Sequence, residues 1–501
     1  MKKTYNQAIE CLNSLQSNAA TIAQPKDRIQ YTLNDMKLYL RCIGHSLNDL
    51  NKLNIIHVTG TKGKGSTCAF TSSILKSISP YAKIGLYTSP HLVAVRERIR
   101  INDKPISEEN FTKYFFDVWN NLNKDDLKSE DDGFNLPSKP PYFRFMTLMA
   151  FHTFLCENVD TAIIEVGIGG TYDCTNLIPQ PTVTAVSNLG LDHTALLGST
   201  IGEIARNKGG IFKHQRPAIS VNQPSEGLEV LNDCANKNET KLDIVDDDYM
   251  SSSINDIDLG LKGHHQKLNA KLAIKIVESF ISNTINNNFS HFKSYLPFNE
   301  KLPSNVIDGL ISAKWPGRCQ TVSDINRKNV TWHLDGSHTD DSLKACVEWY
   351  TKQIKQDSKK ILIFNCTNGR SAFGLLETIF KTLQIELKDK FNPLDFFNSF
   401  IFTTNITYTS GNYASDLNNK MIDEKLLTDL KIQNDLKKAL LTLLPSLNES
   451  RIFIVPSIQQ AINHVDNNIN DNKNELEILV CGSLHLIGGV IEVSKLSSVA
   501  L

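Results

Sequence analysis

The sequence predicts an α/β protein of two domains, each built around a largely parallel β-sheet. Short apolar, β-branched runs alternate with helical stretches, which is the pattern of strand–helix–strand units. Two such series follow one another along the chain, and the junction lies near residues 302–314. The 501 residues, 41% of them hydrophobic, are enough to bury two full cores. We therefore predict an N-terminal domain over residues 1–312 and a smaller C-terminal domain over residues 313–501.

The first series starts at residues 53–59, an apolar β-branched run that stops at a glycine cluster and is typical of a buried parallel strand. Residues 66–78 follow it with apolar and small side chains at helical spacing. Further strands of this series are predicted at residues 84–87, 161–166, 183–187 and 218–221. Its further helices are predicted at residues 108–120, 142–156 and 201–208.

The second series supplies the C-terminal sheet. Its strands are predicted at residues 330–334, 360–366, 397–403, 451–455 and 477–480, with helical segments between them. A cleft between two domains is where ligands usually bind. Three polar tracts, 123–141, 282–290 and 466–474, lack the apolar residues needed to offset their ordering entropy, so we expect surface insertions and assign them no function.

The composition excludes several classes of protein. Lys and Arg total 53 against 54 Asp and Glu, so no bulk charge favours nucleic acid or an anionic membrane. No stretch approaches the roughly 18 apolar residues of a spanning helix. Ten scattered cysteines without a CxxC pair indicate reduced thiols in an intracellular protein. Residues 1–16 contain no apolar signal core and no arginine, so we expect a cytoplasmic protein, with a mitochondrial pool as the alternative.

The most informative string is HVTGTKGKGST at residues 57–67, between a predicted strand and a predicted helix. Glycines let the backbone approach phosphate oxygens, and a helix N-terminus presents unpaired N–H groups to an anion. The string departs from the common GxxxxGK[ST] pattern because Gly65 follows Lys64. A glycine-rich turn alone is more often only a turn, but the strand, lysine and hydroxyl residues together favour nucleotide binding. The expected phosphate contacts are Gly60, Thr61, Lys62, Gly63, Lys64, Gly65, Ser66 and Thr67.

Three oxygen or nitrogen ligands follow other predicted strands of the first series. Ser89, Glu165 and His193 each come after such a strand, and the carboxyl ends of parallel strands open on one edge of the sheet. We therefore expect a hydroxyl, a carboxylate and an imidazole beside the nucleotide. Ser89 is otherwise an ordinary turn residue and His193 a structural histidine. Glu165 is harder to dismiss, because an acid that ends a buried strand is costly without a partner.

The GTKGKGS string resembles the variant of the Mur ligase superfamily, whose members join amino acids to carboxylates with ATP. The remaining motifs resemble the folylpolyglutamate synthase family, in its eukaryotic branch. They occur in family order over about residues 4–490, and their joint occurrence is specific. They are LNSLQSN at 12–18, TSPHL at 88–92, VRERI at 95–99, EVGIGG at 165–170 with Asp173 and Thr175-Asn176, LDHT at 191–194, WPGR at 315–318 and LDGSHT at 334–339.

The resemblance implies roles for particular residues. It implies an ATP-binding N-terminal domain of the Mur ligase type and a Rossmann-like C-terminal ligase domain, and it assigns Ser89, Glu165 and His193 to Mg2+. It further implies that Lys208, otherwise a solvated lysine, is carbamylated and binds a second Mg2+. It implies ATP contacts by Arg318, otherwise part of a surface ion pair, and by Asp335, otherwise a helix N-cap. It also implies that His338, otherwise a capping histidine, approaches the reacting groups, and that His264 and Asn269 line the nucleotide pocket.

The implied reaction adds L-glutamate to the γ-carboxylate of a tetrahydrofolate or folylpolyglutamate. ATP converts the inert carboxylate into an acyl phosphate that an amine attacks, so the site needs cations and backbone donors rather than a nucleophile. Lys64, Lys208 and His338 are accordingly the catalytic candidates, while Cys68 and Cys174 are expected to pack in the core. We expect ATP and Mg2+ as cofactors, with K+ as a possible monovalent addition, and a monomer. The loop at 167–176 is expected to influence pterin selectivity.

Three alternatives remain open. A dihydrofolate synthase shares the phosphate loop and chemistry but acts on dihydropteroate, and the LNSLQSN and VRERIRIN segments favour the polyglutamate enzyme. A muramyl ligase needs a UDP-binding domain, for which we expect no room before Leu53. A nucleotide-dependent switch without ligase activity is disfavoured by the complete set of Ser89, Glu165, His193 and Lys208.

Overall fold

The computed structural model describes residues 3–16, 26–122, 127–298, 301–355, 357–366, 369–410, 429–468 and 475–501. The chain divides into two compact units. The first comprises Met1–Pro90, Arg96–Gly260 and Gln266–Lys314. The second comprises His91–Val95, Leu261–His265 and Trp315–Leu501, so two short stretches within residues 1–312 belong to it.

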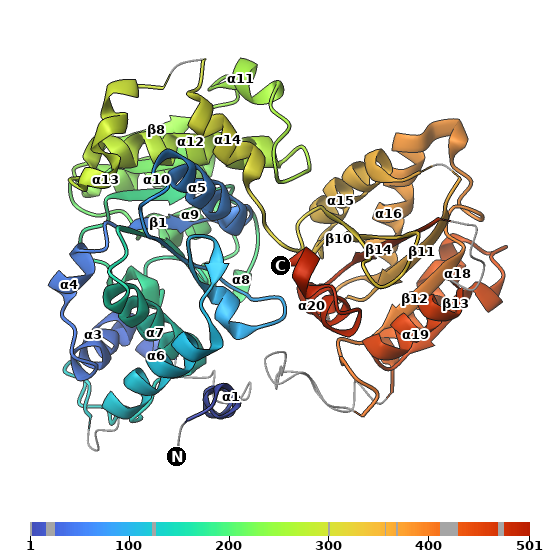
Figure 1. Ribbon diagram of the computed structural model, residues 1–501, viewed down its shortest axis with the longest axis horizontal. Coiled ribbons are helices and arrows are strands. Elements are labelled where there is room, and N and C mark those ends of the chain that lie inside the picture. Colours follow the sequence, from blue (N-terminus) through green and yellow to red (C-terminus); the bar gives the residue numbers. More distant parts are fainter. Residues whose placement is uncertain are drawn as a thin grey trace. The chain divides into compact units, whose positions relative to one another are not determined.

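The first unit contains an eight-stranded sheet, of which Figure 1 labels β1 and β8. Its strand order is β4-β3-β2-β5-β1-β6-β7-β8. Its central strand, β1, pairs in parallel with β5 on one side and β6 on the other. All four residues of β1 are buried, as expected for a parallel strand covered on both faces. The strands are β1 Ile56–Thr59, β2 Ile84–Tyr87, β3 Ile99–Ile101, β4 Lys104–Pro105, β5 Thr161–Glu165, β6 Val183–Val186, β7 Ala218–Val221 and β8 Leu242–Val245.

The outer strands β3 and β4 form an antiparallel hairpin that the sequence analysis did not predict. Both turn residues, Asn102 and Asp103, have positive φ angles of 51° and 65°. This is the conformation that two-residue hairpin turns require, and Asn and Asp tolerate it well. The Asn-Asp pair after Ile-Arg-Ile was therefore a usable signal.

The helices of the first unit cover both faces of its sheet. The helix after the phosphate loop, α5, is buried on most of its circumference and packs against α12 and α14. A Cβ at Gly309 of α14 would lie 2.5 Å from the Cα of Ile74, so glycine permits this close helix contact. The helices are α1 Tyr5–Ser14, α3 Thr32–Cys42, α4 Leu47–Asn51, α5 Lys64–Ile78, α6 Glu108–Asn121, α7 Tyr142–Cys156, α8 Thr194–Leu197, α9 Ile201–Gly209, α10 Ser225–Lys237, α11 Ser251–Asn255, α12 Gln266–Asn283, α13 Asn287–Ser290 and α14 Ser304–Ser312.

The second unit contains a six-stranded sheet with the order β13-β12-β11-β14-β10-β9, in which only β9 runs antiparallel to its neighbour. Successive residues of β11 belong to two different cores: Leu362 lies under α15, α16 and α18, while Ile363 lies under α19 and α20. Helices therefore cover both faces, and the predicted α/β fold class is confirmed. The strands are β9 Gln320–Ser323, β10 Val330–Leu334, β11 Lys359–Phe364, β12 Ser399–Thr403, β13 Ile452–Val455 and β14 Leu476–Cys481. The helices are α15 Asp340–Gln353, α16 Ala372–Leu387, α18 Lys431–Leu443, α19 Ile458–Asn468, α20 Leu484–Val493 and α21 Ser497–Ala500.

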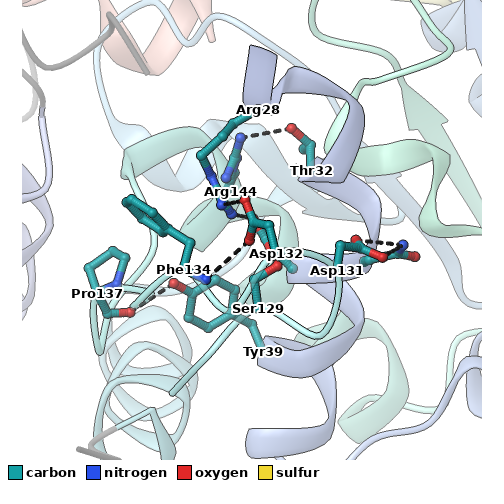
Figure 2. A network of polar contacts seen from close by, with 11 residues as sticks. Arg28, Thr32, Tyr39, Ser129, Asp131, Asp132, Phe134, Pro137 and Arg144 are labelled. Atoms are coloured by element: carbon teal, nitrogen blue, oxygen red, sulfur yellow. Dashed lines mark hydrogen bonds and ion pairs between the residues drawn. The ribbon is translucent and has the colours of Figure 1, made fainter. Parts of the chain in front are cut away.

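The polar tract at 123–141 is exposed over most of its described residues, as predicted for a surface insertion, but it is also bonded to the rest of the unit. Figure 2 shows that the part of it that the structure describes is bonded to the N-terminal helices. The buried Arg28 guanidinium pairs with Asp132 of the tract and, at 3.1 Å, with Asp35 of α3. The Ser129 hydroxyl, also buried, donates to Asp35 at 2.7 Å. The Arg28 guanidinium thus bridges two carboxylates, and this ion-pair network ties the tract to α3.

The other two polar tracts differ in what the structure describes. In the tract at 282–290, the side-chain amides of Asn286 and Asn288 donate to the Asp160 carboxylate at 3.2 and 2.7 Å. In the tract at 466–474, residues 469–474 lie outside the described residues. No helix in the described part of the chain is long and apolar enough to span a membrane.

Candidate functional site: a phosphate loop and its neighbours

The phosphate loop joins the end of β1 to the start of α5. Gly60 has a φ of 147°, and a Cβ there would lie 1.9 Å from the Ser187 hydroxyl oxygen. Gly63 has a φ of 89°, and a Cβ there would lie 2.2 Å from Oδ1 of Asn269. Both positions therefore exclude any side chain. The loop between them fits tightly against the segment after β6 and against α12.

Hydrogen bonds fix the shape of this loop. The backbone N–H groups of Thr61 and Lys62 both donate to the Asn188 carbonyl oxygen, at 2.9 and 3.1 Å. The Ser187 hydroxyl donates to the Lys62 carbonyl at 2.8 Å. These two amides are therefore already bonded within the protein. The N–H groups that open toward a ligand are those of the first turn of α5, which have no partner inside the helix.

Two lysine side chains converge on one carbonyl oxygen of the loop. Lys64 Nζ donates to the Gly60 oxygen at 3.1 Å, and Lys208 Nζ, from α9, donates to the same oxygen at 2.8 Å. Lys208 is almost completely buried. Burial, and secondarily the charge of Lys64, lowers the pKa of Lys208 to about 7, while Asp192 and Asp173 act in the opposite direction. The mouth of the loop is thus built to attract an anion.

A buried carboxylate lies beside the loop at the same sheet edge. Glu165 is the last residue of β5, which is the neighbour of β1, and only 4% of its surface is exposed. Its Oε2 accepts a hydrogen bond from the backbone N–H of Ser89, which follows the next strand, β2, at 3.0 Å. The structure therefore brings Ser89 and Glu165 together. A carboxylate and a hydroxyl are oxygen ligands of the kind that Mg2+ prefers.

His193 occupies a different setting. It precedes α8 with a φ of 50°, and half of its side chain is exposed. Its Nε2 lies 3.9 Å from the carboxylate of the adjacent Asp192, which also bears on the charge of Lys208. Among the described residues, no three or more His, Cys, Asp or Glu side chains are grouped so as to hold a metal ion. The role of His193 toward Mg2+ therefore stays a prediction.

The loop at 167–176 ties the phosphate loop to the helix that carries Lys208. The Thr59 hydroxyl, at the end of β1, donates to the Gly169 carbonyl at 2.6 Å. From the same loop, the Thr171 hydroxyl donates to the carbonyl oxygen of Asn207 in α9 at 2.9 Å. Lys208 follows Asn207 and reaches back to Gly60. The segment from the end of β1 to Gly60, the loop at 167–176 and α9 are therefore each bonded to the other two.

Helix α12 supplies one contact that the sequence analysis missed. Gln266 Nε2 donates to the hydroxyl of Ser66 in the phosphate loop at 3.3 Å, and Gln266 Oε1 accepts from Asn269 at 2.9 Å. The predicted Asn269 thus lies against the loop, as the Gly63 geometry also shows. Gln266 belongs to the same GHHQKLNA block, so its position was available as a signal. His264 belongs to the second unit, and its role stays a prediction.

The second unit gathers its three predicted residues around the turn after β10. The buried Asp335 accepts the Cys319 N–H at 2.7 Å and the Ser337 N–H at 2.8 Å. His338 Nδ1 donates to the Gly336 carbonyl at 2.8 Å. A Cβ on Gly336 would lie 2.5 Å from Nη1 of Arg318, so the guanidinium lies directly on this turn. The N-cap alternative for Asp335 is wrong, because Thr339 caps α15.

Two curated relatives match nearly the whole chain. The folylpolyglutamate synthase of Candida albicans is 40% identical over 98% of this chain and 96% of its own length. That of Saccharomyces cerevisiae (strain ATCC 204508 / S288c) is 42% identical over 98% of this chain and 87% of its own. The chain belongs to the folylpolyglutamate synthase family. The family prediction from the sequence is confirmed.

Other comparisons agree with this folylpolyglutamate synthase assignment. The family described as dihydrofolate synthetase, C-terminal domain, matches residues 318–493. The Mycobacterium tuberculosis folylpolyglutamate synthase complexed with ADP has the same fold, with a TM-score of 0.70, 20% identity and 98% of each chain covered. An FPGS–AMPPCP–folate complex superposes with a TM-score of 0.64 at 22% identity, covering 98% of this chain and 99% of the other.

The family assignment bears on the predicted chemistry. The predicted enzyme class, an ATP-dependent ligase of folates, is the one that the family name describes, and it overturns the muramyl ligase and switch alternatives. All ten cysteines lie among the described residues and are free thiols. Cys68 and Cys174 are buried, and burial raises the pKa of both thiols. Neither is an activated nucleophile, in agreement with the prediction that they pack in the core.

Proposed function

We propose that the chain joins L-glutamate to the γ-carboxylate of a tetrahydrofolate or folylpolyglutamate, using ATP and Mg2+. The observation that carries this proposal is the Lys64 ammonium at a glycine-lined helix N-terminus, beside the buried Glu165. Such a site can bind a triphosphate and stabilise the charge that moves during phosphoryl transfer. It contains no activated thiol, which fits a reaction that proceeds through the substrate's own carboxylate.

The reaction divides into two steps. The folate γ-carboxylate attacks the γ-phosphorus of ATP, which forms an acyl phosphate and releases ADP. The amine of glutamate then attacks the acyl carbon, phosphate leaves, and a proton is lost to give the amide. Lys64 and the first-turn amides of α5 hold the phosphates and offset their negative charge, while the loop at 167–176 keeps α9 and Lys208 in place.

Ser89 and Glu165 fit a magnesium ion, because both lie at the phosphate-loop edge and Glu165 is a buried carboxylate. The bound ion would neutralise phosphate charge and help to orient the γ-phosphoryl group. His193 is the third predicted ligand. A K+ requirement, the roles of Arg318, Asp335 and His338 toward the nucleotide, a monomeric state and a cytoplasmic location with a mitochondrial pool stay predictions.

The proposed activity is tested by following ADP release with tetrahydrofolate while glutamate or Mg2+ is omitted in turn. We expect release only with the complete mixture, together with a folate product that is longer by one glutamate. ADP release without any glutamate-containing product would contradict the proposal. The measurement needs only the intact chain and a mass determination of the folate product.

A dihydrofolate synthase activity is the second candidate, because the family that matches residues 318–493 carries that name. The two activities share the phosphate loop and differ in the acceptor. Offering dihydropteroate in place of tetrahydrofolate separates them. We expect glutamate-dependent ADP release with tetrahydrofolate and not with dihydropteroate, and the reverse preference would exchange the two assignments.

We further propose that Lys208 is carbamylated. Since burial lowers its pKa to about 7, a large part of this amine is unprotonated near neutral pH. The unprotonated, neutral amine adds to the carbon of CO2 and loses one proton, which gives an anionic carbamate that would suit a second Mg2+. Below pH 7 the amine becomes protonated, so carbamylation weakens as the pH falls through this value.

We expect removal of CO2 from the buffer to lower ADP release, and added bicarbonate to restore it. Mass spectrometry should show one added CO2 on the wild type and none on Lys208→Met. Lys213→Met is the matched control, because burial also lowers the pKa of Lys213, to about 8, but its amine donates to Asn176 instead of Gly60. A bicarbonate response that persists in Lys208→Met would refute carbamylation at this residue.

A further inference from the structure

A histidine lies buried beneath the phosphate loop, and the proposed mechanism does not use it. His57 is the second residue of β1, between Ile56 and Val58, and it has no exposed surface. Burial lowers its pKa to about 3, so the imidazole is neutral at physiological pH. Burying a polar ring in a strand of apolar residues costs free energy unless a hydrogen bond compensates it. The identity of its partner is therefore informative.

The partner of His57 is the hydroxyl of Thr175, in the loop at 167–176. His57 Nε2 lies 2.9 Å from Thr175 Oγ1, and Thr175 Oγ1 lies 2.6 Å from Oδ1 of Asp173. The Thr175 hydroxyl can donate only one hydrogen bond, and it donates this bond to the Asp173 carboxylate, which is the stronger acceptor. His57 Nε2 therefore carries a proton and donates it to Thr175. Its Nδ1, which has no hydrogen bond, is then an unpaired acceptor rather than a stranded donor.

Asp173 in turn organises the loop around one buried carboxylate. Its Oδ1 accepts the backbone N–H of Thr175 at 2.9 Å, and its Oδ2 accepts the N–H of Ile168 at 3.1 Å. Both ends of the loop thus close on the same side chain. Two residues of β1, His57 and Thr59, point to this loop and bond to it at different places.

We propose that His57 is a positioning residue, which holds the loop at 167–176 against β1. Its Nε2–H donates a hydrogen bond to the Thr175 hydroxyl, which in turn donates to the Asp173 carboxylate. The distance between β1, which leads into the phosphate loop, and the loop at 167–176, which bonds to α9, is then fixed. The consequence is an aligned pair of groups, the loop that receives the triphosphate and the Lys208 side chain that reaches Gly60. This inference rests on the proposed function, because the alignment serves phosphoryl transfer.

The proposal is tested with His57→Leu, which removes the donor, and His57→Gln, whose amide nitrogen can replace Nε2. We expect His57→Leu to lower kcat by about 10- to 100-fold, because a displacement of about 1 Å costs that much in alignment. The KM for ATP should change little, since the phosphate contacts remain. His57→Gln should recover most of the loss. His464→Leu, which replaces a partly buried histidine of α19, is the control and should retain the wild-type kcat.

Two further measurements keep the proposal falsifiable. Thr175→Val should reproduce the kcat loss, and the double variant His57→Leu/Thr175→Val should be no worse than either single variant, since both break one chain of bonds. Hydrogen exchange at the amides of Ile168 and Thr175 should accelerate in His57→Leu and slow again in His57→Gln. This exchange readout does not depend on activity, so it separates failure of the inference from failure of the proposed function.

Additive kcat losses, unchanged exchange, or a His57→Gln variant as impaired as His57→Leu would each overturn the positioning role. A thermal midpoint is recorded for every variant. A kcat loss that follows only the fraction of folded protein would also overturn the proposal, because it would reduce His57 to a residue of the core.

Discussion

Replacing Lys64 by alanine is expected to lower kcat for glutamate-dependent ADP release by about 1,000-fold or more. The Lys64 ammonium is 3.1 Å from the Gly60 carbonyl, at the mouth of the phosphate loop. A charged donor placed where phosphoryl charge develops contributes several kcal/mol to the transition state, and each 1.36 kcal/mol corresponds to a factor of about ten in rate. The variant should fold, because Lys64 is the first residue of α5 and alanine favours a helix.

The matched control is Lys76→Ala on the same helix. Lys76 Nζ donates to the carbonyl of Pro80 near the other end of α5, so we expect unchanged kcat and KM. Initial rates of ADP release with tetrahydrofolate and glutamate measure both variants. Turnover by Lys64→Ala within about tenfold of the wild type would refute its assignment as the lysine that stabilises the transferred phosphoryl group.

Replacing Glu165 by glutamine is expected to lower kcat by about 100-fold or more and to raise the Mg2+ concentration needed for half-maximal rate. Glutamine retains an oxygen that accepts the Ser89 N–H bond, so the local structure is preserved. It lacks the charge, and a magnesium ligand set relies on one or two carboxylates. Titrating Mg2+ against ADP release measures the shift. The largest effect should appear at low Mg2+, where affinity limits the rate.

Glu157→Gln is the control for this substitution. Glu157 follows α7 and accepts the Tyr114 hydroxyl at 2.6 Å, away from the phosphate loop. We expect the Mg2+ dependence of this variant to match that of the wild type. If Glu165→Gln shows an unchanged Mg2+ dependence, Glu165 is a structural partner of Ser89 rather than an ion ligand.

Much of the fold was predictable because local pattern and global fold agree. The β-branched run that becomes β1 is buried on every residue, and it ends at the glycines that the phosphate loop requires. The fold class followed from the alternation of such runs with helices. The hairpin of β3 and β4 was missed because its strands have only three and two residues, too few to show a period of two.

The candidate site was predictable in part. Motifs placed Lys64 in its loop and Ser89 and Glu165 at strand ends, and the structure brings Ser89 and Glu165 into contact. The bond from Lys208 to Gly60 spans 148 positions, and no local pattern encodes a contact over that distance. The ion pair of Arg28 with Asp132 was missed for the same reason, since the composition of the polar tract predicts only a surface insertion.

The position of Lys208 at the Gly60 carbonyl, which Lys64 shares, has a consequence for the order of binding if Lys208 is carbamylated as we propose. An incoming polyphosphate would favour the protonated form of the neighbouring Lys208, because an opposite charge within a few ångströms raises the pKa of an amine. Protonation removes the lone pair that captures carbon dioxide. If Lys208 is carbamylated, as we propose, its carbon dioxide adduct would therefore form more readily before the nucleotide binds than after it.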